Sequence, residues 1–232
     1  IKGGEGAGIW EKGAMFRFFQ VNRDIFLRTL CLVAVTLFFT SAGASQGEII
    51  LAVNTLLMQL FTLFSYVMDG FAYAGEALSG RYIGARNREA FTDTVRHLFG
   101  WGAVIAVLFT LVYALGGNAF LGLLTDDKEV IAVADTYFYW ALAVPAVGIA
   151  AFIWDGIFIG ATATRGMLLS MAAAAVSFFI LYYGLHPVLA NHALWLAFLT
   201  YLLMRGVVQT GLSREVIRRC LLYTSDAADD GE

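Results

Sequence analysis

The chain has 232 residues, of which 59% are hydrophobic and only 14% are charged, and its mean hydropathy is +0.73. Soluble domains are about 45–50% apolar and about 25% charged, so this composition excludes an ordinary soluble protein. The 15 Lys and Arg residues are too few to indicate a nucleic-acid partner.

The apolar residues fall into six blocks, which span 25–44, 49–75, 98–117, 131–160, 167–189 and 193–212. About 20 consecutive apolar residues span a bilayer as a helix, whereas open strands would leave backbone groups unpaired in lipid. Runs such as LCLVAVTLFF (30–39) do not alternate as the strands of a membrane barrel do. The sequence therefore predicts an all-α integral membrane protein, a bundle of six transmembrane helices.

The basic residues are distributed very unevenly between the two ends of these predicted helices. Fourteen of the 15 lie at one end of the predicted helices. They precede or begin the first block, follow or end the sixth, or lie between the second and third or between the fourth and fifth blocks. The exception is Lys128, between the third and fourth blocks. Loops on the cytoplasmic side of a membrane collect Lys and Arg. We therefore expect both ends of the chain to be cytoplasmic.

The two ends of the sequence differ in character from the rest. The opening IKGGEGAG (1–8) is typical of a glycine-rich linker cut mid-chain. Residues 9–20 either lie flat in the membrane interface or form a plain polar approach to the first helix. The segment 220–232 has no basic residue and ends in acids, and its CLLYTSDAAD stretch resembles a translated sequencing adapter. We expect 220–232 to be non-native, which leaves Cys31 alone and excludes a disulfide or thiolate metal site.

Motifs that would indicate an enzyme are weak. GASQG (43–47) matches the G-x-S-x-G pattern of hydrolases, but that pattern needs a strand-to-helix turn, and here it falls in a short loop between predicted membrane helices. His97, His186 and His192 are scattered near helix ends without metal-ligand spacing. No phosphate-binding or dinucleotide motif is present in the sequence. We expect no enzymatic activity and no metal site.

One carboxylate lies within the second apolar block and another directly follows it. Asp69 and Glu76 are seven residues apart, and seven residues make nearly two full turns of a helix, so both side chains share one face about 10 Å apart. A charge at mid-membrane costs about 2.5–3.5 kcal/mol, so we expect both to face the bundle interior or a water-filled cavity. Glu76 alternatively reaches the headgroups, because it precedes Arg81 by five residues, and Asp69 alternatively has a structural role.

A third carboxylate repeats this pattern. AAFIWDGIFIGATATRG (150–166) aligns with FSYVMDGFAYAGEALSGR (64–81), since each has an Asp-Gly pair, small and aromatic residues, a Gly and then an Arg. Asp155 thus occupies a place like that of Asp69, on a helix of the same direction. GRYIG (80–84) and GIFIG (156–160) have the small-xxx-small spacing that lets helices approach closely.

Other features of these two helices are typical of transporters. The Gly after each Asp and Pro145 should loosen the helices, as in transporters that build their sites on bent or discontinuous helices. Polar side chains within the same two blocks are candidates for substrate binding, and each alternatively contributes only to helix packing. They are Asn54, Gln59, Tyr66, Tyr137 and Tyr139.

The stretches AVNTLLMQLFTLFSYVMDGFAYAGEALSGRYIGARN and WDGIFIGATATRGM, together with NRDIFLRTLCLVAVTLFFTSAGA, resemble the second half of a multidrug and toxic compound extrusion (MATE) transporter of the bacterial DinF-like branch. The resemblance covers about 20–215. It implies a protein of the bacterial inner membrane with twelve helices in two lobes, of which this chain carries the last six. Residues 1–20 would then be a truncated inter-lobe linker, 21–219 the C-terminal lobe, and the missing N-terminal lobe a partner.

The resemblance also implies a function. Such proteins exchange H+ or Na+ for organic, often cationic compounds. Acidic residues of the second lobe, including one on the tenth helix, take part in coupling in related branches. Asp155 lies on the matching helix, and Asp69 and Glu76 lie on the eighth. In the DinF-like branch much of the proton coupling is assigned to an Asp on the first helix, which lies outside this sequence.

We therefore expect a cation-coupled antiporter that exports organic, drug-like compounds by alternating access, with H+ or Na+ as the coupling ion and no other cofactor. One alternative is a flippase for lipid-linked oligosaccharides, which would need more basic residues lining its cavity. Another is a membrane scaffold subunit without transport, for which the acids would face lipid or be sealed against neighbouring helices. An intramembrane enzyme would need a nucleophile and a base, and the sequence offers no such set.

Overall fold

The computed structural model describes residues 12–222, so the first half of the expected linker and most of the segment 220–232 lie outside the described residues. Six helices follow one another within this range: α1 (Lys12–Ala44), α2 (Glu48–Gly84), α3 (Arg88–Leu124), α4 (Lys128–Gly160), α5 (Thr164–Leu189) and α6 (Asn191–Leu222). Each contains a segment long and apolar enough to cross a membrane. The prediction of an all-α bundle with six transmembrane helices is confirmed.

Helices α3 and α4 begin before the corresponding apolar blocks, and each begins at a side-chain cap. The side chain of Asn87 accepts a hydrogen bond from the backbone of Ala90 at the start of α3. At the start of α4, Asp127 accepts from the backbone of Glu129 and Val130. Side-chain oxygens of this kind satisfy the amide groups that the first turn of a helix leaves free.

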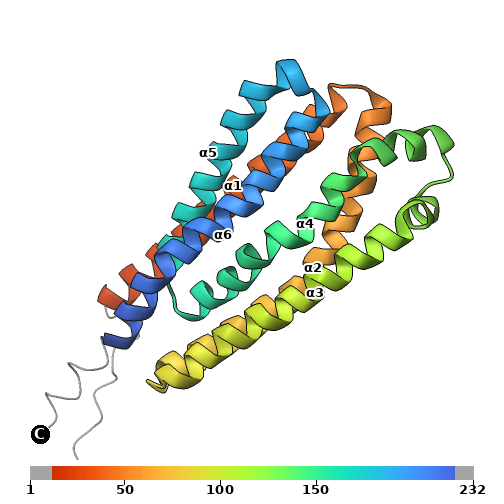
Figure 1. The fold of residues 1–232 in the computed structure, drawn as a ribbon. Helices are drawn as coiled ribbons and strands as arrows, with labels where there is room; N and C mark the ends of the chain where they lie inside the picture. The colour runs from red at the N-terminus through yellow and green to blue at the C-terminus, as the bar shows by residue number, and fades with distance from the viewer. Residues whose placement is uncertain (1–11, 223–232) are drawn as a thin grey trace, which may run out of the picture.

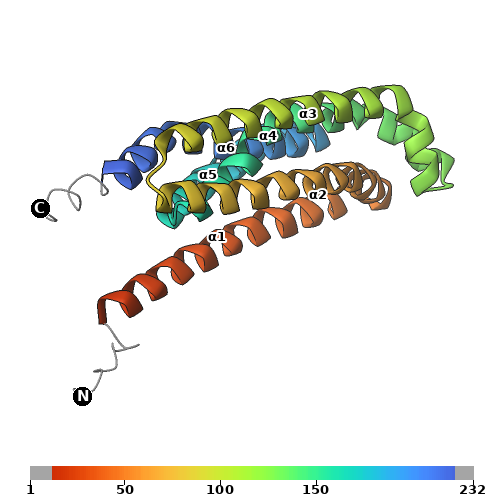
Figure 2. The ribbon, with the colours of Figure 1, turned by 90° about the horizontal axis from the view of Figure 1, so that it is seen from below.

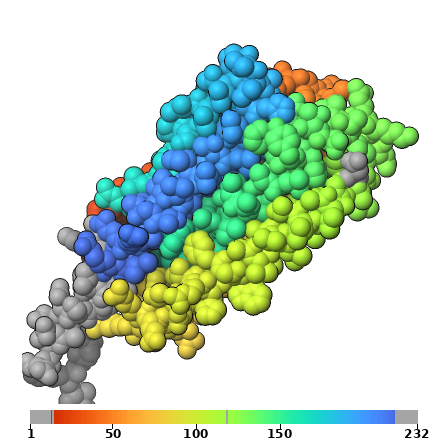
Figure 3. Space-filling view, viewed as in Figure 1, coloured from red at the N-terminus to blue at the C-terminus, as the bar shows by residue number. Residues whose placement is uncertain are grey.

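Helix α4 occupies the middle of the bundle, where it packs against α2, α3 and α6. Figure 3 shows the surfaces of α6, α4 and α3 side by side on one face of the molecule. Helices α5 and α6 form a second closely packed pair (Figure 1). Helix α1 lies at the edge, mainly against α5, and its N-terminal end diverges from the other helices (Figure 2).

Glycines bring α2 and α4 into close contact, as the small-xxx-small spacing predicted. A Cβ atom on Gly156 would lie 2.0 Å from the backbone oxygen of Ala72, and one on Gly160 would lie 2.3 Å from that of Glu76. Real Cβ atoms do not approach oxygen this closely, so only glycine fits at either position. The two Asp-Gly helices are therefore held side by side.

Neither α2 nor α4 is discontinuous beside its Asp-Gly pair, and the expected loosening of the two helices by these glycines and by Pro145 stays a prediction. Both helices run past Asp69 and Asp155 without a break, because Gly156 serves close packing against α2 instead of unwinding α4. The backbone departs from helical geometry in α3, at Gly117, where φ is 7° and ψ is −102°. The membrane-spanning part of α3 accordingly ends at this residue.

Candidate functional site

A buried carboxylate in α4 is the centre of a charged cluster. Asp155 is 8% exposed, and its Oδ2 atom forms ion pairs with Arg28 of α1 and with Arg205 of α6, the latter at 2.5 Å. Its Oδ1 atom accepts a hydrogen bond of 2.5 Å from Gln209. Arg205 and Gln209 are four residues apart and so share one face of α6. The cluster therefore joins α1, α4 and α6.

The two arginines exceed the single carboxylate between them by one positive charge. Arg205 also lies over the rings of Phe152 and Tyr201, with its guanidinium carbon 5.9 and 5.6 Å from the ring centres. Buried ions need such partners, because removal from water is costly. Within the described residues, the Nε atoms of both arginines are buried without a hydrogen-bond partner. The Asp155 cluster thus retains unused donors.

Asp69 completes the charge balance of this cluster from α2. It is close enough to Asp155, Arg205 and Arg28 to interact with them electrostatically, and these two acids and two bases have a formal charge sum of zero. Unlike Asp155, Asp69 is half-buried, and within residues 12–222 it belongs to no close ion pair. Asp69 is therefore the more exposed of the two acids.

Glu76 lies apart from this cluster. It is half-buried on α2, and its backbone oxygen faces Gly160, one turn of α4 beyond the closest contact of α2 and α4 at Gly156. In the described helices no close ion pair connects it to the Asp155 cluster. Its predicted role in coupling therefore stays a prediction.

The candidate substrate residues of α2 lie in three different environments. Asn54 is buried and exchanges hydrogen bonds of 2.8 and 2.9 Å with Asn191, and it accepts a third from Trp195 at 2.9 Å. These bonds connect α2 to the start of α6. Gln59 is exposed beside a pocket of about 530 Å³ near the α3–α4 connection, and Tyr66 is 71% exposed.

The two tyrosines of α4 meet at His192 of α6. The hydroxyl of Tyr139 lies 3.0 Å from Nδ1 of His192, and Trp140 donates a hydrogen bond of 3.1 Å to the same atom. The ring of Tyr137 lies 4.6 Å from the imidazole, centre to centre. Tyr137 precedes Asp155 by 18 residues, about 27 Å of helix, so these tyrosines lie far from the charged cluster.

The sequence does not predict Arg28 and Arg205 as site residues, because there they serve only as basic residues that orient the helices in the membrane. A signal was present for Arg205, because it follows the apolar run LTYLLM and precedes Gln209 by one helical turn. Another residue that the pattern did not single out is Asp24, which is buried in the first half of α1. It precedes Arg28 by one turn of the same helix.

A family model described as MatE matches residues 25–188. The chain belongs to the MatE family. It is 42% identical over 196 residues to the DNA damage-inducible protein F of Escherichia coli, covering 84% of this chain and 42% of that protein. It is also 26% identical over 133 residues to the Protein DETOXIFICATION 45, chloroplastic, of Arabidopsis thaliana, covering 57% of this chain and 24% of that protein.

A solved structure gives the fold of this MatE chain independently. The crystal structure of MATE in the bent conformation matches with a TM-score of 0.71 at 17% identity, covering 87% of this chain and 44% of that one. The chain therefore spans less than half the length of each of these proteins. The resemblance to MATE transporters and the prediction of one transporter lobe are confirmed.

Proposed function

We propose that the chain is the C-terminal six-helix lobe of a cation-coupled antiporter in the bacterial inner membrane, which exports organic compounds by alternating access. The observation that supports this proposal is a group of two acids and two arginines inside a MatE-family bundle, in which Asp155 and Arg205 are buried and Asp69 and Arg28 are half-buried. Ionisable groups within membrane segments are costly and mark ion and substrate pathways. The N-terminal lobe is the partner that completes the transport path.

The proposed roles of the two acids differ because their surroundings differ. Asp155 is sealed by Arg28, Arg205 and Gln209, so it holds its charge and positions the cluster. Asp69 is half-buried beside it and is the acid that exchanges a proton or Na+. With Asp69 ionised the four groups sum to zero; with Asp69 protonated they carry +1.

This difference in charge couples the ion to the substrate. A cationic substrate is attracted when Asp69 is ionised and repelled when Asp69 holds a proton, so ion and substrate compete for one site. A ligand shifts a conformational equilibrium only by the difference in its affinity for the two states. Competition at Asp69 would thus exchange one ion for one substrate as the lobes alternate.

A second candidate function is a flippase for lipid-linked oligosaccharides. It is favoured by the two arginines inside the bundle, whose Nε atoms lack a partner within the described residues and would suit a phosphate. Both guanidinium groups are already paired with Asp155, however. The sealed Asp155 alone would also suit a scaffold subunit, whereas the half-buried Asp69 would not.

Efflux from cells tests the proposed function. The full-length parent is expressed in an efflux-deficient bacterium, and export of a cationic dye is followed with and without the substitution Asp69→Asn. We expect Asp69→Asn to abolish export at normal expression. The matched control Asp126→Asn, an exposed acid of the α3–α4 connection, should leave export unchanged. No dye export by the unsubstituted parent, or unchanged export by Asp69→Asn, would contradict the proposal.

A further inference from the structure

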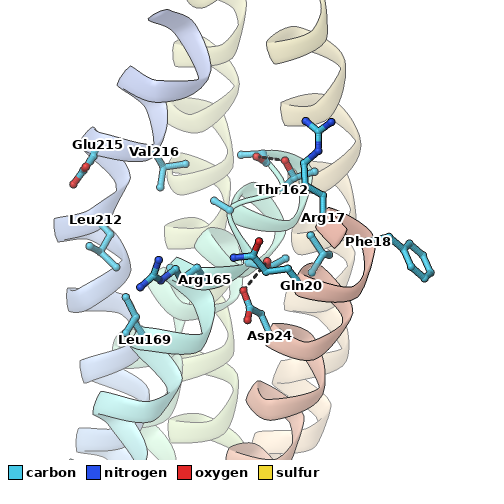
Figure 4. A pocket seen from close by; sticks show the side chains of 15 residues that line it. Arg17, Phe18, Gln20, Asp24, Thr162, Arg165, Leu169, Leu212, Glu215 and Val216 are labelled. Atoms are coloured by element: carbon cyan, nitrogen blue, oxygen red, sulfur yellow. Dashed lines mark hydrogen bonds between the residues drawn. The ribbon is translucent and has the colours of Figure 1, made fainter. Parts of the chain in front are cut away.

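A buried carboxylate of α1 lies one helical turn from the Asp155 cluster. Asp24 is 1% exposed and precedes Arg28 by four residues. Its Oδ2 atom accepts a hydrogen bond of 3.4 Å from Thr164 at the start of α5, drawn as the dashed line at Asp24 in Figure 4. Its Oδ1 atom pairs at 3.0 Å with Arg23, whose side chain is 62% exposed. Both contacts are weak, because the first is long and the second is open to water.

Arg28 has this carboxylate within reach as well as that of Asp155. An Asp and an Arg at positions i and i+4 are neighbours on the surface of a helix, and helical side chains lean toward the N-terminus, here toward Asp24. In the structure Arg28 pairs with Asp155 instead, and within residues 12–222 no close ion pair joins it to Asp24. Arg28 therefore has two acids available and uses one of them.

Arg205, the other arginine on Asp155, lacks this freedom. Its side chain is 6% exposed, against 19% for Arg28, and its guanidinium group lies over the rings of Phe152 and Tyr201. Its helix, α6, packs directly against α4, whereas α1 lies mainly against α5. Of the two arginines, Arg28 is therefore the one that can leave Asp155.

The charge on Asp69 decides which position of Arg28 leaves the cluster neutral. With Asp69 ionised, the two acids and two arginines sum to zero. With a proton or Na+ on Asp69 the cluster carries +1, and an unbalanced charge is costly between membrane helices. Transfer of Arg28 to Asp24 removes this excess, because Asp155 and Arg205 then form one neutral pair and Asp24 and Arg28 form another.

The other charged side chains around Asp24 do not prevent this transfer. Arg17 and Arg165 line the same pocket of about 810 Å³ as Asp24, and in the described part of the chain neither forms a close ion pair with it. Glu215, the second acid in that pocket wall, has a partner of its own. An incoming guanidinium group would thus meet a carboxylate whose present partners hold it weakly.

We propose that Arg28 moves from Asp155 to Asp24 when a proton or Na+ occupies Asp69, which makes Asp24 a positioning residue of the transport cycle. This inference rests on the proposed function, since it needs Asp69 as the acid that exchanges the ion. The ion pair that joins α1 to α4 then forms only in the ion-free state.

A double-mutant cycle on the full-length parent tests the transfer without measuring transport. Asp69→Asn gives the cluster the charge that it has with a proton bound. Asp24→Asn keeps an acceptor for Thr164 but removes the charge that attracts Arg28. A switch that places Arg28 on Asp24 in about 90% of molecules needs about a tenfold preference. At alkaline pH, where the wild-type Asp69 is ionised, Asp24→Asn should therefore lower the folding equilibrium constant about tenfold more in the Asp69→Asn background than in the wild type, as measured by thermal unfolding in detergent.

Asp93→Asn is the matched control, because Asp93 is an acid of α3 that pairs at 3.8 Å with an arginine three residues later, Arg96. It should have the same effect in both backgrounds. An equal loss for Asp24→Asn in the two backgrounds would overturn the proposal, because the contacts of Asp24 with Thr164 and Arg23 alone give that result.

Transport separates this proposal from the proposed function. In proteoliposomes, Asp24→Asn should slow gradient-driven dye movement about tenfold, and Asp24→Glu should restore it, because Glu also pairs with an Arg four residues later. Movement at the wild-type rate in Asp24→Asn would overturn the role of Asp24 and leave the proposed function standing. No movement by the unsubstituted parent would overturn the proposed function, whatever the result of the cycle.

Discussion

Gly156 lies where α4 approaches α2 most closely, one residue after the carboxylate at the centre of the charged cluster. A Cβ atom at this position would lie 2.0 Å from the oxygen, 2.6 Å from the carbonyl carbon and 2.7 Å from the Cα atom of Ala72. All three are backbone atoms, so no side-chain rotation relieves the clash. Overpacking typically costs about 1–3 kcal/mol, and we expect Gly156→Ala to reach the upper end of this range.

The loss of stability should be accompanied by a loss of transport, because separating α4 from α2 also moves Asp155 away from Asp69. Thermal unfolding in detergent measures the first effect, and dye export by the full-length parent measures the second. Gly70→Ala is the matched control: a Cβ on Gly70 meets no atom within 4 Å, and alanine is favoured over glycine in a helix by about 1 kcal/mol. Equal unfolding temperatures for Gly156→Ala and Gly70→Ala would refute this reasoning.

Three further predictions concern the remaining contacts and the topology. Arg205→Gln should lower the free energy of unfolding by about 3–5 kcal/mol, as measured by thermal unfolding. Arg28→Gln should lower it by less, because the side chain of Arg28 is 19% exposed and that of Arg205 only 6%. Equal losses for the two variants would contradict this order. Asn54→Ala should cost about 1–3 kcal/mol in the same assay, because it leaves two buried partners unsatisfied, and no loss would mean that water replaces them. Single cysteines at positions 126 and 87, with the native cysteines replaced, should be labelled from outside the cell only at 126; labelling only at 87 would reverse the orientation.

The six helices could be predicted from the sequence because the length of an apolar block is set by the thickness of the bilayer. The close packing of α2 against α4 could also be predicted from the sequence, because the glycines of GIFIG have the spacing that lets a neighbouring backbone approach. The ends of the helices were harder to predict from the sequence. For example, α2 continues to Gly84 through residues as polar as Arg81, and hydropathy contains no signal for this.

The composition of the charged cluster was only partly predictable. The sequence placed Asp69 and Asp155 on two helices that cross the membrane in the same direction. It used Arg28 and Arg205 only to orient the helices. The rule for cytoplasmic loops counts charges and says nothing about the direction in which a side chain points. Similarly, the bond of Asn54 to Asn191 joins residues 137 positions apart. A single sequence does not specify such a pair.

Ion-driven dye uptake or release in proteoliposomes containing the full-length parent tests the central claim most directly. Dye movement is measured after an imposed H+ or Na+ gradient, together with the unfolding temperature of each protein. Asp69→Asn should abolish gradient-driven movement while unfolding near the wild-type temperature. Asp155→Asn should lower the unfolding temperature, because the buried Arg205 and the half-buried Arg28 lose their common charged partner. Gradient-driven movement at the wild-type rate in Asp69→Asn would contradict the claim that Asp69 exchanges the coupling ion.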